Sequence, residues 1–149
     1  MTEIIDFASI KKKSTIGKEF TFLDGDAART RDSFGYAAIM NEALHTVARK
    51  IIQKVATEGL PGAHHLYIRF DTTTNGVFLD DYLRSKYPAE MVIQLQHKFT
   101  DLDVTDTDFT VTLQFEGTPK KIVIPFMSII SVVDPSVPFG FGMIDPSNV

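Results

Sequence analysis

The chain has 149 residues, of which 44% are hydrophobic, so one domain with a sizeable core is expected, with or without a tail. It contains no Cys, which excludes disulfides and cysteine-ligated metals and fits a reducing, cytoplasmic compartment. The formal net charge of −4 argues against a dedicated nucleic-acid binder, which usually carries a basic surface. No apolar run approaches the roughly 18 residues of a membrane span, and the N-terminus does not have the pattern of a signal peptide.

Residues 1–33 have the pattern of a flexible tail. Their positive and negative charges nearly balance, and their apolar residues form small islands without a helical or strand period. We expect this segment to be mostly disordered when it is free.

A long helix is predicted after the tail, with Ser33 as its N-cap. Apolar residues then recur at spacings of three and four, which places them on one helix face. They are Tyr36, Met40, Leu44, Val47, Ile51 and Val55, and the stripe is widened by Ile39, Ala43, Ala48 and Ile52. Gly59 and Pro61 end the helix. The face has two interpretations: it only covers the core of the following domain, or part of it also pairs with its copy in a homodimer.

Short strands are predicted in the rest of the chain, because apolar and polar residues alternate there. The expected strands are 65–70, 91–96, 102–104, 109–115, 122–124 and 139–143, with a buried strand or a strand plus a single turn at 126–133. A short helix is expected around 80–86, capped by Asp80 and Asp81. One long helix followed by about six strands predicts a mainly β, α+β fold, as a small barrel or sandwich.

Two stretches have the composition of a peptide-binding groove. The stretch MVIQLQHKF begins as a strand and then sets amide, imidazole, ammonium and aromatic groups side by side, at Gln96, His97, Lys98 and Phe99. In DPSVPFGFGM, Phe139 and Phe141 are two residues apart and so share one face of an extended segment. A groove for an extended peptide needs such apolar pockets beside polar groups that orient its backbone.

No convincing catalytic or metal site emerges from the sequence. His64 and His65 are adjacent at a strand start, point to opposite faces and so cannot easily share an ion. His45 lies on the helix between Glu42 and Arg49, where a solvated histidine is expected. The motifs HExxH, GxSxG, GxxxxGK and GxGxxG are missing. We therefore expect no metal, no cofactor and no enzymatic activity.

The chain from His64 to Phe141 resembles SspB, the bacterial adaptor family that delivers ssrA-tagged proteins to the ClpXP protease. Four segments carry this resemblance: HHLYIRFDT (64–72), SKYPAEMVIQLQHKFTDLDV (85–104), FTVTLQFEGTPKKIVIPF (109–126) and DPSVPFGF (134–141). With the preceding helix they cover about two thirds of the chain, in the right order. The resemblance implies an open Sm-like or SH3-like barrel, and it favours a homodimer formed through the helix, at Tyr36, Met40, Leu44, Val47 and Ile51.

The resemblance also implies that the tag-binding groove is formed by Gln96, His97, Lys98 and Phe99. Gln96 would exchange amide hydrogen bonds with an asparagine-rich tag, Lys98 would meet its acidic residue, and Phe99 would form an apolar wall. The alternative is that Phe99 belongs to the core and that Lys98 is a solvated charge. Phe139, Phe141 and Met143 are weaker candidates, since the end of a barrel often only closes the core.

Family members usually carry a C-terminal arm that ends in a ClpX-docking peptide, whereas this chain stops at Val149. The stretch IIDFASIKKK resembles that peptide, through Ile4, Ile5, Phe7, Ile10, Lys11 and Lys12. One interpretation is that docking has moved to the N-terminus, with residues 17–32 as a linker. The others are an ordinary basic-hydrophobic leader and a chain trimmed at its C-terminus.

The predicted organisation is a tail (1–33) with the docking peptide, a helix plus barrel domain (34–144) and a short C-terminal end (145–149). The leading function is a substrate-delivery adaptor with ssrA-tagged proteins and the ClpX ATPase as partners. The alternative is an Sm-like RNA-binding module, since small barrels bind single strands through basic grooves and aromatic stacking. The dispersed lysines and arginines count against it, and strongly salt-dependent oligonucleotide affinity would support it.

Overall fold

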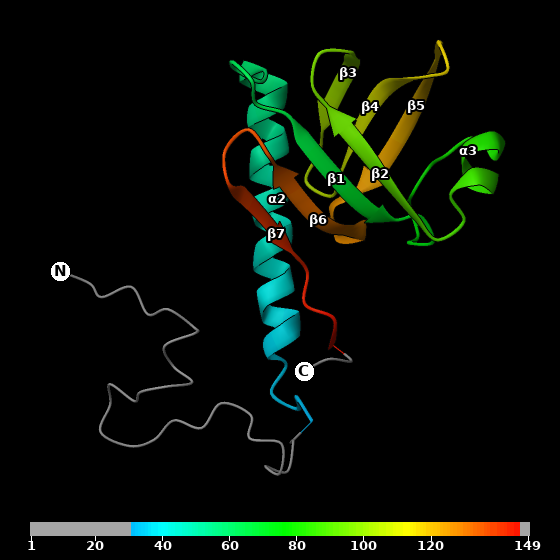
Figure 1. Cartoon of the computed structure of the whole chain (residues 1–149). Helices are drawn as coiled ribbons and strands as arrows, with labels where there is room; N and C mark the ends of the chain where they lie inside the picture. Colours follow the sequence, from blue (N-terminus) through cyan, green and yellow to red (C-terminus); the bar gives the residue numbers. More distant parts are fainter. Residues whose placement is uncertain (1–30, 147–149) are drawn as a thin grey trace. The chain divides into compact units, whose positions relative to one another are not determined.

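The longest element is helix α2 (Tyr36–Glu58), with 23 residues, seen in a computed structural model that describes residues 31–146 (Figure 1). It ends as predicted at Gly59, whose N–H donates to the carbonyl of Val55 at 2.8 Å. The prediction of Ser33 as N-cap is wrong. The N-cap is Gly35, in the left-handed region at φ 89°, while the Ser33 hydroxyl donates to the carbonyl of Arg31 at 3.3 Å. The chain thus enters the helix through a backbone conformation that favours glycine.

Within residues 31–146, seven strands form two antiparallel sheets. The four-stranded sheet has the order β2-β1-β6-β7 and contains β1 (Leu66–Asp71), β2 (Glu90–Leu95), β6 (Ile129–Asp134) and β7 (Phe139–Gly142). The three-stranded sheet has the order β3-β4-β5 and contains β3 (Phe99–Val104), β4 (Asp108–Phe115) and β5 (Thr118–Pro125). Helix α3 (Asp81–Lys86) follows β1, and the 3-10 turn η1 (Phe126–Ser128) precedes β6. The mainly β, α+β class with a helix near the N-terminus is confirmed; both sheets are open, and the Sm-like barrel stays a prediction.

Strand β3 begins three residues before its predicted start at residue 102. Its pairing with β4 shifts between Thr100 and Asp103, and Asp101 has a positive φ of 54°. Such a bulge interrupts the alternation of side chains, so the first half of the strand has no readable period. The consequence for the site is that β3 starts directly after the segment Gln96–Lys98.

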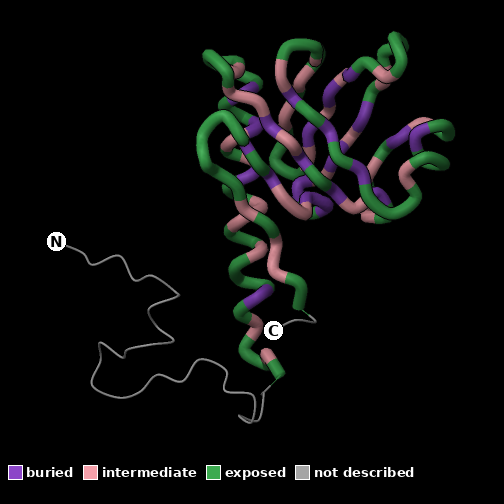
Figure 2. Tube along the Cα trace, in the orientation of Figure 1, coloured by how far each residue is buried: buried purple, intermediate pink, exposed green. Residues whose placement is uncertain are grey.

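The core lies between the sheets and one face of α2. In β2 the buried residues Met91, Ile93 and Leu95 alternate with the exposed Val92 and Gln94, as predicted (Figure 2). Burying a side chain of this size contributes about 1.5–3 kcal/mol. The second half of α2 adds Ala48, Ile52 and Val55 to the same core.

The predicted apolar stripe of α2 is divided between the core and solvent. Tyr36, Met40 and Val47 have relative accessibilities of 64%, 50% and 38%. The residues that α2 buries are Ala37, Ala48, Ile52 and Val55, and the last three of them belong to the predicted stripe. The helix therefore has a face that covers the core and a neighbouring face of large apolar side chains in contact with solvent.

Asn41 holds the C-terminal segment against α2. Its Nδ2 donates to the carbonyl of Ile144 at 2.9 Å, and the N–H of Ile144 donates to its Oδ1 at 2.8 Å. The N–H of Met143 donates to the carbonyl of Ile130 at 2.7 Å, which extends the β6–β7 pairing. The side-chain amide of Asn41 thus makes the two hydrogen bonds that a neighbouring strand residue would make, and it joins α2 to the segment after β7.

Asp80 caps helix α3, as predicted. Its Oδ1 accepts a hydrogen bond from the N–H of Leu83 at 2.8 Å, and its Oδ2 pairs with the ammonium of Lys120 on β5. The hydrogen bond from Lys120, followed by that from Leu83, lowers the pKa of Asp80. One carboxylate thus starts the helix and ties it to the three-stranded sheet.

Candidate functional site

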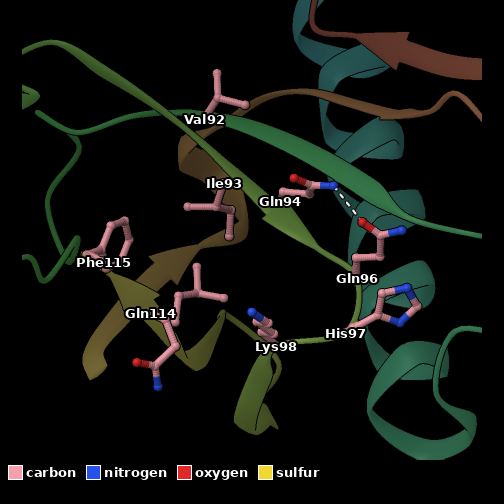
Figure 3. Close-up of a pocket in the computed structure, with 9 residues that line it drawn as sticks. Val92, Ile93, Gln94, Gln96, His97, Lys98, Gln114 and Phe115 are labelled. Atoms are coloured by element: carbon pink, nitrogen blue, oxygen red, sulfur yellow. Dashed lines mark hydrogen bonds between the residues drawn. The ribbon is translucent and has the colours of Figure 1, made fainter. Parts of the chain in front are cut away.

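A groove with a volume of about 370 Å³ lies between β2 and the end of β4 (Figure 3). Its walls come from β2, from the segment that joins β2 to β3, and from β4. The lining residues are Val92, Ile93, Gln94, Gln96, His97, Lys98, Leu113, Gln114 and Phe115. Ile93 and Leu113 are buried and form an apolar bottom, whereas Gln94, His97 and Lys98 are exposed at the rim. The groove therefore offers an apolar pocket with amide and cationic groups around it.

Two glutamine side chains meet at one wall of the groove. Nε2 of Gln94 donates to Oε1 of Gln96 at 2.9 Å, as the dashed line in Figure 3 shows. Each amide keeps further donor or acceptor capacity, because a side-chain amide has two N–H groups and a carbonyl. The pair is exposed, so an entering peptide amide can exchange hydrogen bonds with it at small cost.

The main chain of β2 faces the groove at Val92 and Gln94. The N–H of Thr72 donates to the carbonyl of Ala89 at 2.9 Å, so that pair exchanges hydrogen bonds between β1 and β2. In an antiparallel ladder such pairs alternate with pairs that point their main-chain groups outward. Val92 and Gln94 are in the outward set, and β2 is the edge strand of its sheet. Their N–H and carbonyl groups therefore have no partner strand within residues 31–146.

The end of β4 forms the opposite wall of the groove. The N–H of Phe126 donates to the carbonyl of Thr107 at 2.9 Å, so by alternation Gln114 points its main-chain groups away from β5 and toward the side of β3. Phe99, the first residue of β3, pairs with Leu113, so the main chain of Gln114 faces that of Lys98. The open main chain of the groove is therefore that of β2, an exposed sheet edge of the kind that accepts an extended peptide.

The structure brings together three of the six predicted peptide-binding residues. Gln96, His97 and Lys98 line the groove, but Phe99 does not: it is half-buried in β3 and packs against the core. Phe139 and Phe141 lie on β7, at the opposite edge of the four-stranded sheet from β2. Their ring centroids are 6.0 Å apart, which agrees with the shared face that the sequence predicts.

Sequence reasoning missed the wall that β4 supplies. Leu113, Gln114 and Phe115 are separated from Lys98 by a whole hairpin, and Gln114 looks like any outward polar residue of an alternating strand. The two stretches meet only because β3 turns back onto β4 at Phe99. No local pattern signals that contact.

Phe139 lines another cavity, of about 310 Å³, together with Ile51, Val55 and Val137. A third, larger cavity of about 990 Å³ lies beside α2, the loops at 74–75 and 106–107, and η1. His45, expected to be solvated, is half-buried in the wall of that cavity, and its buried Nε2 has no hydrogen-bond partner among the described residues. These two cavities lie apart from the groove and share no lining residue with it.

His64, Asp134 and Ser136 form a polar cluster that does not have the geometry of a catalytic triad. His64 Nδ1 lies 2.6 Å from Asp134 Oδ2, and the Ser136 hydroxyl donates to Asp134 Oδ1 at 2.6 Å. A triad needs the histidine to join the serine and the carboxylate through two different ring nitrogens. Here the same ring nitrogen of His64, Nδ1, lies 2.6 Å from Asp134 Oδ2 and 3.5 Å from the hydroxyl oxygen of Ser136. Within residues 31–146, no three His, Cys, Asp or Glu side chains come close enough to hold a metal ion.

The fold and the groove have the geometry of a peptide-recognition module, in which an exposed sheet edge accepts an extended segment. The profile of the stringent starvation protein B family, SspB, matches residues 38–148. The chain belongs to the SspB family, as its resemblance predicted, and this is a family of adaptors that are generally not enzymes. A comparison with curated proteins gave no match. No helix in the part of the chain that the structure describes is long and apolar enough to cross a bilayer.

The cluster around Asp134 generates a prediction about acid stability. Burial opposes ionisation of Asp134, but hydrogen bonds from Ser136 and His64 outweigh it and hold the pKa of this carboxyl far below its usual value. A group with a lowered folded pKa stabilises the protein above its unfolded pKa, about 3.9, and this stabilisation is lost as the pH falls toward the folded pKa. Asp134→Asn should therefore reduce the free energy of unfolding at pH 7 by about 1.5–3 kcal/mol and flatten its decline in acid.

Urea unfolding at pH 7, 5 and 3.5 measures both effects. Asp103→Asn serves as the control, because Asp103 is exposed on β3. Equal acid slopes for the Asp134 variant and the intact protein would show that the cluster does not carry the predicted pH dependence.

Proposed function

We propose that the protein is a substrate-delivery adaptor that binds ssrA degradation tags in the groove and tethers tagged proteins to the ClpXP protease. The observation that supports this most directly is the open main chain of the edge strand β2 beside the groove. A peptide in extended conformation can pair with this edge. Such pairing gives affinity for any peptide, and the side-chain pockets then select the sequence.

The lining of the groove suits a tag with amide, acidic and small apolar residues. The buried Ile93 and Leu113 accept an apolar side chain, and Gln94 and Gln96 exchange amide hydrogen bonds. Lys98 is exposed at the rim, and no ion pair of Lys98 is found within residues 31–146. Its ammonium is thus placed to pair with a peptide carboxylate, in a charge-assisted hydrogen bond.

The alternative, an Sm-like RNA-binding module, is less well supported by the cations of the domain. Arg69 pairs with Glu90 at 2.7 Å, and Lys120 pairs with Asp80. Arg84 donates to two main-chain carbonyls, those of Thr72 and Val77. Cations paired in this way do not form the positively charged groove that binding of single-stranded RNA requires.

Weak individual contacts are enough for an adaptor. A tether raises the local concentration of a bound substrate at the protease to about the millimolar range for a short flexible linker. Two tag sites in a dimer add a second attachment without any new contact. The proposed function therefore has three parts, which are tag binding, dimerisation and docking, and each can be tested by itself.

Tag binding is tested by the fluorescence polarisation of a labelled ssrA-tag peptide. Lys98→Ala should weaken binding about 10- to 150-fold, because loss of a charge-assisted hydrogen bond costs about 1.5–3 kcal/mol. Lys121→Ala is the matched control, since Lys121 is an exposed lysine of β5 outside the groove. Equal affinities of the two variants would argue against the groove, and no saturable binding by the intact protein would argue against the adaptor itself.

Dimerisation is predicted to use the exposed face of α2. Met40→Glu with Val47→Glu places two charges on that face, where burying each without a partner is strongly unfavourable. The variant should sediment as a monomer in analytical ultracentrifugation, whereas the intact protein sediments as a dimer. The control is Gln53→Glu, on an exposed position of α2 outside the predicted dimer face. An intact protein that is itself monomeric at micromolar concentration would overturn the prediction.

Docking is predicted to lie in residues that the structure does not describe. The peptide formed by Ile4, Ile5, Phe7, Ile10, Lys11 and Lys12 falls outside residues 31–146. Deletion of residues 1–13 should abolish the enhanced degradation of a tagged substrate by ClpXP and leave the Kd for the tag peptide unchanged. Delivery that survives the deletion would place docking elsewhere.

A further inference from the structure

The walls of the groove continue into rows of side chains that cross the outer face of the four-stranded sheet. The register places Gln94 of β2 opposite Tyr67, Tyr67 opposite Val133, and Val133 opposite Gly140 of β7. A second row runs from Val92 through Arg69 and Ser131 to Gly142. Directly opposite residues of an antiparallel pair project from the same face. Both rows therefore begin at groove residues and end at β7.

The rows face away from the core. The alternate residues of the same strands, among them Ile93, Ile68 and Val132, are buried. Side chains alternate between the faces of a sheet, so the two rows lie on the outer one. Figure 1 shows the strands of this sheet, whose order β2-β1-β6-β7 makes β2 and β7 its two edges.

This outer face is more apolar than the solvated side of a sheet usually is. Val92 and Val133 have relative accessibilities of 53% and 39%, and Tyr67 is half-buried, with its ring edge-on to that of His65 at 5.6 Å. The charges of Arg69 and Glu90 neutralise one another, since Arg69 Nη2 lies 2.7 Å from Glu90 Oε2. The two rows thus join exposed aliphatic and aromatic groups around one matched ion pair, and the carboxylate of Asp71 lies beyond the rows, opposite Glu90.

Glycines leave the far end of both rows uncovered. A Cβ at Gly140 would lie 3.1 Å from Cγ2 of Val133, so a side chain there would crowd the valine. Without one, Val133 stays accessible from the β7 side. A row spans three strand spacings, about 14 Å, which matches about four residues of an extended chain.

From these observations we propose that the outer face of the four-stranded sheet is a subsite for the residues that flank the tag in the groove, and that it prefers apolar and aromatic side chains. The occupant is the same peptide, because Gln94 and Val92 belong both to the groove and to the rows. A chain that leaves the groove past Gln94 meets Tyr67 next and then Val133. The inference rests on the proposed function, since it extends the peptide that the groove holds.

Peptides of three lengths test the subsite by fluorescence polarisation. One is the tag alone, and the others add four residues, Val-Tyr-Val-Tyr, before or after it. One of the two extensions should lower the Kd of the intact protein about five- to tenfold, and the same extension in Ser-Gly-Ser-Gly form should not. The double variant Tyr67→Ser, Val133→Ser should lose this gain while its affinity for the tag alone stays unchanged.

A second variant adds an obstruction instead of removing contacts. Gly142→Glu places its Cβ at ordinary contact distances, 3.6 Å from the carbonyl of Ile130 and 3.8 Å from Ser131 Cβ, and projects a charge onto the face. It should also cancel the gain. Val137→Ser, at an exposed valine in the turn before β7, is the control that should keep it.

The outcomes separate this inference from the proposed function. If the tag alone binds but neither extension improves the Kd, or if the gain persists in both face variants, the subsite is wrong and the groove stands. If the tag alone does not bind the intact protein, the proposed function fails and the subsite fails with it.

Discussion

The constraint on which the site depends is the exposed edge of β2. Strand β2 is an edge of its sheet, and the main-chain groups of Val92 and Gln94 point away from β1. The opposite wall of the groove is the end of β4, which lies against Phe99 and the segment before it. Exposed edges are a liability that proteins usually cover or blunt. Here the open edge of β2 borders a groove with a buried apolar bottom, which is the form that a strand-like ligand completes.

Helix α2 divides its surface between two tasks. Its core face uses small and branched side chains, Ala48, Ile52 and Val55, whereas its large side chains at Tyr36 and Met40 face solvent. Large exposed apolar patches on a soluble protein usually mark an interface. The bonds of Asn41 to Ile144 keep the last strand beside this helix. A partner that docks on the helix therefore meets a surface held in place by the core on one side and by β7 on the other.

The sequence predicted the class of the fold and half of the groove, for reasons that are local. Alternation located β1, β2 and β4, Gly59 marked the end of α2, and the polar residues after Leu95 marked one wall of the groove. The other wall comes from pairing across a hairpin and has no local signal. The start of β3 was not predicted, because a bulge at Asp101 interrupts its alternation. The N-cap of α2 is Gly35 and not Ser33, because the helix begins with a left-handed backbone conformation and not with a hydrogen bond from a serine side chain.

The placement of charge completes the argument for where a ligand binds. Arg69 is matched by Glu90 and Lys120 by Asp80, each across two different elements of the fold, and Asp134 is hydrogen-bonded to His64. These pairs stabilise the packing of strands and loops. Because their charges cancel, they exert little long-range electrostatic attraction on a ligand. Lys98 differs because its ammonium stands at the rim of an apolar groove, where a carboxylate that enters is partly removed from water. The attraction between two opposite charges strengthens as water is excluded around them. A peptide that fills the groove therefore strengthens the interaction of Lys98 with its carboxylate and makes binding selective for an acidic residue.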